Sequence, residues 1–279
     1  MIRAWIANRL LDWLCYSPIA RGKYRLAQAA SLLGLDGIPV RTIYGPKLLT
    51  RFQDSTFWLA ARKGNEGVIR LLSDLSSEDV FIDVGANQGL TTAFGCQFCS
   101  AVIALEPSPR EFEWLLRNAS LTHPERQRPV LMLSAAAEKQ GYTSFRIGHV
   151  SHSGGNSMGL PESREEIGIT VATIALDDLF NPDSLDSFQE LKQAWDSCHL
   201  VVKIDVEGYE SSVLRGMKAL LAQRRCRKVI VEVDAKRAQM LGIEFDVDAF
   251  MRSYGYEATV QNLFAEHFDQ CYVPAAVLV

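Results

Sequence analysis

Three charged residues alternate at the end of an apolar run, in the segment Lys203-Ile-Asp-Val-Glu-Gly208. Alternate side chains of an extended strand point to one face, so Lys203, Asp205 and Glu207 would share a face. Asp205 is the preferred candidate for a general base or for a ligand of a cationic amine, and Glu207 is the second candidate. Lys203 would orient either carboxylate or stabilise a developing alkoxide. The alternative is a structural ion pair at a strand end.

A turn containing two glycines follows an earlier apolar run, in the segment Val80-Phe-Ile-Asp-Val-Gly-Ala-Asn-Gln-Gly89. Gly85 and Gly89 allow a sharp turn and the close approach of a ligand. The dinucleotide-binding fingerprint fails, because Asn87 stands where its second glycine would be. Asp83 would repel a pyrophosphate, and it suits a ligand with an ammonium group and no phosphate, such as S-adenosylmethionine. The alternative for Asp83 is an acid that only caps the loop.

Glu106 follows the next apolar run, 21 residues after Gly85. A carboxylate at the end of the second strand can accept hydrogen bonds from both hydroxyls of a ribose, as in dinucleotide-binding folds. A solvated strand end is the alternative for this residue alone. Taken together, the glycine loop, Asp83 and Glu106 predict a nucleoside-containing cofactor at the carboxyl edge of a sheet.

The elements that position these residues are short apolar runs alternating with amphipathic helical patterns, which is typical of βαβ units on a parallel sheet. The predicted strands are Val80–Val84, Val102–Leu105, Val130–Leu133, Leu200–Ile204 and Val229–Val233, with a final strand over Tyr272–Val279. Continuous apolar strands are expected where helices cover both faces. The sequence therefore predicts a Rossmann-like, doubly wound α/β fold with a mostly parallel sheet.

Two helices between these strands have clear signals. A capping box at Ser108–Glu111 predicts a helix start with proline at the first helical position. The residues expected on the apolar face of this helix are Phe112, Leu115, Leu116 and Ala119, and those of the helix after the fourth strand are Val213, Leu214, Met217, Leu220 and Leu221. We interpret both stripes as core.

The pattern divides the 279 residues into an N-terminal helical extension, residues 1–50, and a single α/β domain, residues 51–279. One helical face of the extension carries Ile2, Trp5, Ile6, Arg9 and Trp13. We expect this face to dock on the domain, with contact to a membrane surface as the alternative. Polar residues interrupt the apolar N-terminus, so the sequence predicts neither a signal peptide nor a transmembrane span, and we expect a cytoplasmic protein.

A glycine- and serine-rich loop, Gly148–Gly159, lies between two strand-like segments, Tyr142–Ile147 and Ile169–Thr173. A loop of this length within a compact domain is typical of a lid or a binding loop. His152 in this loop is a reserve candidate for the base, whereas the pair that it forms with His149 lacks the further ligands of a metal site.

Composition excludes several classes of partner. The net charge of −4 argues against a nucleic-acid partner, and we interpret the basic run Arg224–Lys228 as a solvated helix end. The six cysteines form no disulfide framework. Cys96 and Cys99 lack the second pair that a zinc site needs, and we interpret them as buried thiols inside a helix. No metal site is predicted.

Three segments together resemble the FkbM-type methyltransferases: Asp83-Val-Gly-Ala-Asn-Gln-Gly89, Leu105-Glu-Pro-Ser108 and Lys203-Ile-Asp-Val-Glu-Gly208. The resemblance extends over about residues 50–235. It implies a class I, Rossmann-like enzyme that uses S-adenosylmethionine, typically to O-methylate hydroxyls of polyketides or sugars.

Carried over by position, the resemblance also implies a set of cofactor-binding residues. Those of the loop are Asp83, Gly85, Ala86, Asn87 and Gly89, and those after the second strand are Glu106, Pro107 and Ser108. Ala136 would lie near the adenine. Glu66, in a Gly64-Asn-Glu66 element, would face the cofactor.

The sequence thus predicts an S-adenosylmethionine-dependent O-methyltransferase that acts on a hydroxyl of a small molecule or sugar, of glycan or polyketide type. Two alternatives remain. A serine hydrolase would use Gly155-Asn-Ser-Met-Gly159, but this segment lacks the strand–elbow–helix context that the motif requires. A non-catalytic subunit could keep the fold and serve in assembly, since a fold does not imply an activity.

Overall fold

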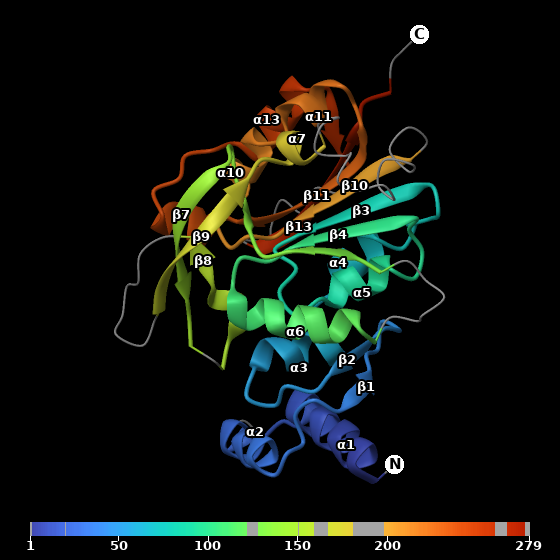
Figure 1. The fold of residues 1–279 in the computed structure, drawn as a ribbon, viewed down its shortest axis with the longest axis vertical. Coiled ribbons are helices and arrows are strands. Elements are labelled where there is room, and N and C mark those ends of the chain that lie inside the picture. The colour runs from blue at the N-terminus through green and yellow to red at the C-terminus, as the bar shows by residue number, and fades with distance from the viewer. Residues whose placement is uncertain are drawn as a thin grey trace.

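The structure is a computed structural model that describes residues 2–19, 21–121, 128–149, 151–158, 167–180, 198–259 and 267–276. Its main feature is a seven-stranded sheet with the order β12-β13-β11-β10-β3-β4-β5 (Figure 1). The strands are β3 (Asp79–Val84), β4 (Ala101–Leu105), β5 (Val130–Met132), β10 (His199–Ile204), β11 (Cys226–Asp234), β12 (Tyr256–Ala258) and β13 (His267–Pro274). The five strands from β11 to β5 run parallel, and β13 runs antiparallel to β11 and β12.

Helices cover both faces of this sheet (Figure 1). One face packs against α7 (Leu176–Leu179), α10 (Glu210–Arg215), α11 (Lys218–Ala222) and α13 (Val247–Ser253). The other face packs against α4 (Glu66–Leu71), α5 (Leu90–Gly95) and α6 (Pro109–Ala119). Along β3, Ile82 belongs to the first core and Phe81 to the second, which is why the middle of this strand, Val80–Ile82, is apolar on both faces. The predicted doubly wound fold and its five parallel strands are confirmed.

Two helix predictions needed correction. The stripe over α10 and α11 is buried as expected. On α6, Leu115 is buried as expected, but Leu116 is 56% exposed, and the polar side chains of Glu111 and Asn118 are buried. Only one of the two hydrogen bonds of the predicted capping box forms. The Ser108 hydroxyl accepts from the Glu111 amide at 3.4 Å, while the Glu111 carboxylate binds arginines.

The structure shifts two sequence predictions along the chain. The last strand, β13, begins at His267 and ends at Pro274, and residues 277–279 lie outside the described part of the chain. Cys96 and Cys99 follow α5, which ends at Gly95, rather than lying inside it. Burial raises the pKa of Cys99 to about 12, in keeping with an inert thiol.

The strand-like segments around the glycine- and serine-rich loop belong to a second, four-stranded sheet, β6-β9-β7-β8. It consists of β6 (Ala135–Ala136), β7 (Gly141–Ile147), β8 (Ser157–Met158) and β9 (Ile167–Ile174). The described part of the loop contains a short 3-10 helix, η1 (Ser153–Gly155), and Gly159 lies outside the described residues. This sheet stands beside the carboxyl edge of the main sheet (Figure 1).

The N-terminal residues form a layer below α5 and α6 in Figure 1. This layer contains α1 (Ile2–Tyr16), α2 (Lys23–Leu32), the hairpin of β1 (Pro39–Arg41) and β2 (Lys47–Leu49), and α3 (Ser55–Arg62). The hairpin was not expected in a helical extension. None of the described helices is long and apolar enough to cross a membrane.

Only part of the face of α1 that we expected to dock on the domain does so, because Trp13 packs against the core cluster while the rest of that face is exposed. Its buried side chains are Ala7, Leu11, Leu14 and Cys15, which pack with α3 in one core cluster. Ile2, Trp5 and Ile6, which we expected to dock on the domain, are exposed. The prediction that they dock on the domain is therefore wrong.

Candidate active site

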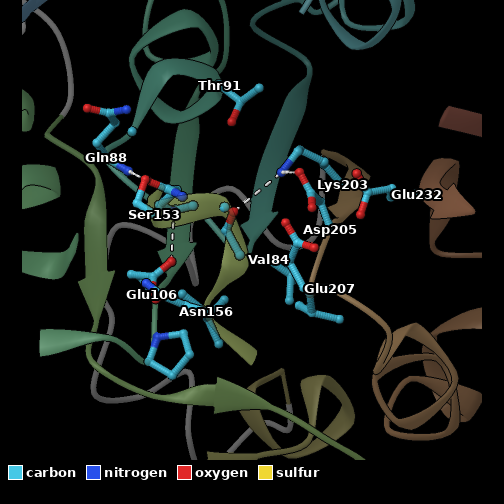
Figure 2. A pocket seen from close by; sticks show the side chains of 18 of the residues that line it. Val84, Gln88, Thr91, Glu106, Ser153, Asn156, Lys203, Asp205, Glu207 and Glu232 are labelled. Atoms are coloured by element: carbon cyan, nitrogen blue, oxygen red, sulfur yellow. Dashed lines mark hydrogen bonds and ion pairs between the residues drawn. The ribbon is translucent and has the colours of Figure 1, made fainter. Parts of the chain in front are cut away.

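A pocket opens at the carboxyl ends of β3, β4, β10 and β11 (Figure 2). It encloses about 1030 Å³ of empty space, including its open mouth. Its floor comes from the ends of these strands, and one side comes from the loop that follows β3. Parallel sheets bind ligands at this edge, because the loops that follow the strands converge there.

The glycine loop approaches its neighbours so closely that side chains would not fit. Gly85 has φ of +78°, and a Cβ there would lie 1.8 Å from the carbonyl oxygen of Asp205. Gly89 has φ of +90°, and a Cβ there would lie 2.6 Å from the Leu115 side chain. The amides of Gly85 and Ala86 both donate to Leu105 O at 3.0 Å. The loop is therefore fixed against β4 and β10, with its backbone facing the pocket.

Glu106 lines the pocket at the end of β4, where it is 5% exposed. Its two carboxylate oxygens accept from the amides of Asn87 and Ser108, both at 2.8 Å. Burial raises the pKa of Glu106 to about 8 despite these bonds. Each oxygen keeps a second lone pair, so Glu106 can still accept hydroxyl donors from a ligand.

Asp83 lies beneath the loop rather than on the pocket surface. It is fully buried, and one oxygen accepts from the hydroxyls of Thr91 at 2.7 Å and Thr92 at 2.6 Å. Its other oxygen lies 3.5 Å from the Lys203 ammonium. Asp83 therefore ties the start of α5 to the end of β10.

Lys203 joins the two strands that frame the pocket floor. Its ammonium lies 3.0 Å from Asp205 Oδ2 (Figure 2). It also lies 3.4 Å from Gly85 O and 3.5 Å from Asp83. The two carboxylates outweigh burial and raise the pKa of Lys203. Lys203 is thus a permanent cation that orients Asp205, and it is not a base.

Three carboxylates, Asp205, Glu207 and Glu232, gather on one wall of the pocket (Figure 2). One oxygen of each lies within 4.8 Å of the others, a spacing that can hold a cation. Glu207 also pairs with Arg237. Glu207 has a positive φ of 58°, in a turn whose Val206 and Gly208 amides donate to Glu210. Lys203 contacts Asp205 through Oδ2, so Asp205 is anchored to the end of β10 while it lines the pocket.

The glycine- and serine-rich loop closes the pocket on another side. The Ser153 hydroxyl donates to Asn87 Oδ1 at 3.1 Å, and Gly154 N donates to the Thr56 hydroxyl at 3.1 Å. Ser153 N also donates to Asp54 at 3.2 Å. The loop, interpreted from sequence as a lid or binding loop, is thus a wall docked on α3.

Most of the predicted cofactor-binding residues line this pocket, namely Gly85, Ala86, Asn87, Gly89, Glu106, Pro107 and Ala136, with Lys203, Asp205 and Glu207 opposite. Asp83, Ser108 and Glu66 do not line it. Glu66 is exposed and accepts from Gly64 N at 2.9 Å, while its neighbour Asn65 lines the pocket. The sequence of this element does not indicate that Asn65, rather than Glu66, lines the pocket.

Sequence reasoning missed several lining residues, including Thr56, Ala60, Phe145, Ser153, Asn156 and Glu232. Glu232 had a usable signal, because it interrupts the apolar run of β11 near its carboxyl end. Thr56 and Ala60 had none, since only the tertiary fold brings α3 to the pocket. His149 and His152 do not line the pocket, and His152 lies 3.3 Å from the Thr56 hydroxyl.

The serine hydrolase alternative finds no support in the geometry. Ser157 lies in β8, is 2% exposed and donates to the carbonyl of Met158. It is not on a turn between a strand and a helix, which is where a nucleophilic serine needs to be.

Comparison with known proteins gives the family. The chain is 28% identical over 228 residues to the hexuronic acid methyltransferase AglP of Haloferax volcanii, covering 81% of each chain. A solved methyltransferase FkbM from Methylobacillus flagellatus KT is similar with a TM-score of 0.47 and 14% identity. That match covers 71% of this chain and 44% of the other, so the chain spans less than half of that protein. A protein of the NADB-Rossmann superfamily from Streptococcus agalactiae has a TM-score of 0.40 and 8% identity, covering 75% of this chain and 68% of that one.

The family match covers the sheet and the strand ends that carry the site. Residues 83–258 match the methyltransferase FkbM domain, and they include the glycine loop, Glu106 and the Lys203–Asp205–Glu207 cluster. This span is more than half of the chain. The chain therefore belongs to the FkbM methyltransferase domain family and is a methyltransferase.

Proposed function

We propose that this methyltransferase binds S-adenosylmethionine in the pocket and transfers a methyl group to a hydroxyl oxygen of a sugar. The observation that carries the proposal is the charge of the pocket. Of the described residues that line it, three are the carboxylates of Asp205, Glu207 and Glu232 and one is the cation Lys203, and Glu106, whose pKa is raised by burial, is a fourth acid. Such a pocket repels a pyrophosphate and suits a ligand that carries ammonium and sulfonium charges.

The residues present fit this cofactor. Glu106 has free lone pairs for ribose hydroxyls, and the glycine loop presents backbone in place of side chains. S-adenosylmethionine supplies an electrophilic methyl group when it is bound. The protein contributes alignment, and the wall formed by η1 and α3 excludes water from one side.

Asp205 is the group that we assign to the proton of the acceptor hydroxyl. Lys203 orients Asp205, because its ammonium is 3.0 Å from Asp205 Oδ2, and Asp205 lines the pocket. Glu207 is held by Arg237 and would contribute charge rather than accept the proton. Glu232 adds a third carboxylate to this wall.

A sugar acceptor is proposed from the name of the relative in Haloferax volcanii, which is called a hexuronic acid methyltransferase. The match to that relative extends over 81% of both chains, so it covers most of the pocket walls as well as the sheet. The reaction we propose is therefore O-methylation of a sugar or uronic acid ring.

Calorimetric titration with S-adenosylmethionine and S-adenosylhomocysteine tests the cofactor, with NAD as the comparison ligand. We expect both S-adenosyl ligands to bind, NAD not to bind, and Glu106→Ala to weaken binding. Release of S-adenosylhomocysteine with uronic acid glycosides and with neutral glycosides then tests the acceptor. Asp205→Asn should lower kcat by about 10²- to 10⁴-fold if Asp205 is the base. A loss of cofactor affinity with unchanged kcat would instead make Asp205 a ligand of the amine.

A further inference from the structure

The outer surface of the N-terminal layer carries large apolar side chains exposed to solvent. Ile2 is 76% exposed and Trp5 63%, and both lie with Ile6 on one face of α1. Leu32 is 84% exposed and Leu33 76%, at the end of α2. We call these five residues the N-terminal apolar surface. In Figure 1, α1 and α2 form the end of the molecule farthest from α11 and α13.

This surface is additional to the faces that fold the helices. The opposite side of α1 is fully packed through Ala7, Leu11 and Leu14, and α2 packs through Ala27 and Ala30. These residues form one core cluster with Phe57 and Trp58 of α3 and with Leu90 of α5. The fold is therefore complete without the outer face, whose exposed apolar groups call for a partner.

A hydrogen bond at the start of α1 connects the part of this surface on α1 with the part at the end of α2. The Arg3 guanidinium donates to the carbonyl of Gly34 at 2.5 Å, directly after Leu32 and Leu33. Arg9 lies over the Trp5 ring, with its guanidinium carbon 5.8 Å from the ring centre. Arg3 and Arg9 thus lie beside apolar side chains of this surface.

The charge of this segment identifies the partner. Residues 2–33 contain five basic side chains, Arg3, Arg9, Arg21, Lys23 and Arg25, and a single acid, Asp12. Asp12 is paired with Arg62 at 2.7 Å, so it offsets none of these charges at the surface. Five basic residues and one acid give residues 2–33 a net charge of +4, whereas the whole chain has a net charge of −4.

We propose that the N-terminal apolar surface docks on the face of an anionic lipid bilayer. Ile2, Trp5 and Ile6 would enter the boundary between head groups and acyl chains, with Leu32 and Leu33 beside them. The arginines would remain at the level of the lipid phosphates, since their long stems allow the charge to reach the head groups. A second copy of the chain is a poorer partner, because a two-fold contact would place the same arginines against one another.

Docking in this way would bring the pocket near the bilayer. The core cluster of α1 includes Ala60 of α3, and Thr56 and Ala60 of α3 line the pocket. One helix layer thus separates the lipid surface from the wall of the pocket. The docking itself does not depend on the proposed acceptor.

Vesicle flotation with the full chain tests the proposal. One vesicle preparation is phosphatidylcholine alone, and the other is an equal mixture of phosphatidylcholine and phosphatidylglycerol. We expect the wild-type chain to bind the mixed vesicles at least about tenfold more tightly, and added salt to weaken that binding. The variant W5S/L32S should lose binding to both preparations. The variant R9Q/R25Q should lose the preference for the anionic lipid.

The matched control is Tyr142→Ser, which removes an aromatic side chain that is 82% exposed on β7, outside this surface. It should bind the vesicles as the wild-type chain does. All the substituted side chains are exposed, so thermal unfolding should be unchanged in every variant. Failure of the wild-type chain to float, or wild-type binding by W5S/L32S, would overturn the proposal. So would a wild-type dimer in the absence of lipid that W5S/L32S dissociates, because the surface would then be an interface between copies.

Discussion

Lys203 holds two carboxylates together beneath the glycine loop, at 3.0 Å from Asp205 and 3.5 Å from Asp83. Lys203→Met would leave Asp83 fully buried without its counter-ion. We expect this variant to lower the free energy of unfolding by about 3–5 kcal/mol, measured by chemical denaturation. The double variant K203M/D83N should regain much of that loss, because it removes both charges. A stable single variant would mean that the ammonium does not compensate Asp83.

Glu106 links cofactor binding to pH. Burial raises its folded-state pKa from 4.5 to about 8, so this group lowers the free energy of unfolding progressively as pH rises through that interval. Ribose hydroxyls donate to the ionised carboxylate, so the bound cofactor should favour release of the proton. We expect the affinity for S-adenosylmethionine to rise by up to about tenfold per pH unit from about pH 6 to about pH 8. Calorimetry in buffers of different ionisation enthalpy should show proton release, and Glu106→Gln should abolish both effects.

Substitutions at Gly85 and Gly242 can distinguish the cost of a left-handed backbone conformation from the cost of a steric clash with the neighbouring backbone. Both have positive φ, of +78° and +64°, but a Cβ on Gly85 would lie 1.8 Å from Asp205 O, whereas nothing lies within 4 Å at Gly242. Gly242→Ala should destabilise the fold by only about 1 kcal/mol, which is the cost of the left-handed conformation. Gly85→Ala should cost clearly more in thermal unfolding and should also abolish cofactor binding. If Gly85→Ala and Gly242→Ala lowered the thermal stability equally, the glycine loop would be able to move away from β10.

At the scale of elements, the strands of the main sheet could be predicted because their signals are local. The middle of a doubly covered parallel strand is apolar, and Asp83 in β3, Glu106 after β4 and Lys203 in β10 mark the carboxyl edge of the sheet. The side of α1 that packs could not be predicted, because this helix is apolar on both sides and only the fold selects Ala7 and Leu11. The position of Thr56 in the pocket could not be predicted either, because it depends on contacts between α3 and segments distant in the sequence.

Asp54 connects two elements that form one wall of the pocket. One oxygen caps α3 through Thr56 N at 3.0 Å and also accepts from Ser153 N at 3.2 Å. Asp54→Ala should therefore increase amide hydrogen exchange in residues 151–158 and lower stability by about 1 kcal/mol. Asp246→Ala is the matched control, since Asp246 caps α13 through Ala249 N at 2.9 Å. Asp246 is exposed and Asp54 also pairs with buried Arg51, so this control should cost less stability, and it should leave exchange in residues 151–158 unchanged.

At the scale of the whole molecule, the N-terminal layer is part of the structure that carries the pocket. One core cluster contains Leu11 of α1, Val40 and Leu48 of the hairpin, Phe57 of α3 and Leu90 of α5. Leu90 directly follows Gly89 and lines the pocket. The sequence predicts that residues 1–50 form an extension and residues 51–279 a domain. Because one core cluster includes residues from both parts, folding experiments are needed to test whether they fold separately.

We expect the full chain to unfold in a single thermal transition, because the cluster joins α1 to the start of α5. A chain that begins at residue 51 would expose Phe52 and Phe57, both fully buried, and would leave α3 without its cover. This truncated chain should aggregate or fail to bind S-adenosylmethionine, as followed by calorimetry and light scattering. The matched control is the full chain with W5S/L32S, which alters only the outer face and should bind the cofactor normally. If the truncated chain folds and binds with wild-type affinity, the N-terminal layer is a separate unit, and the cluster contributes little to the position of α3.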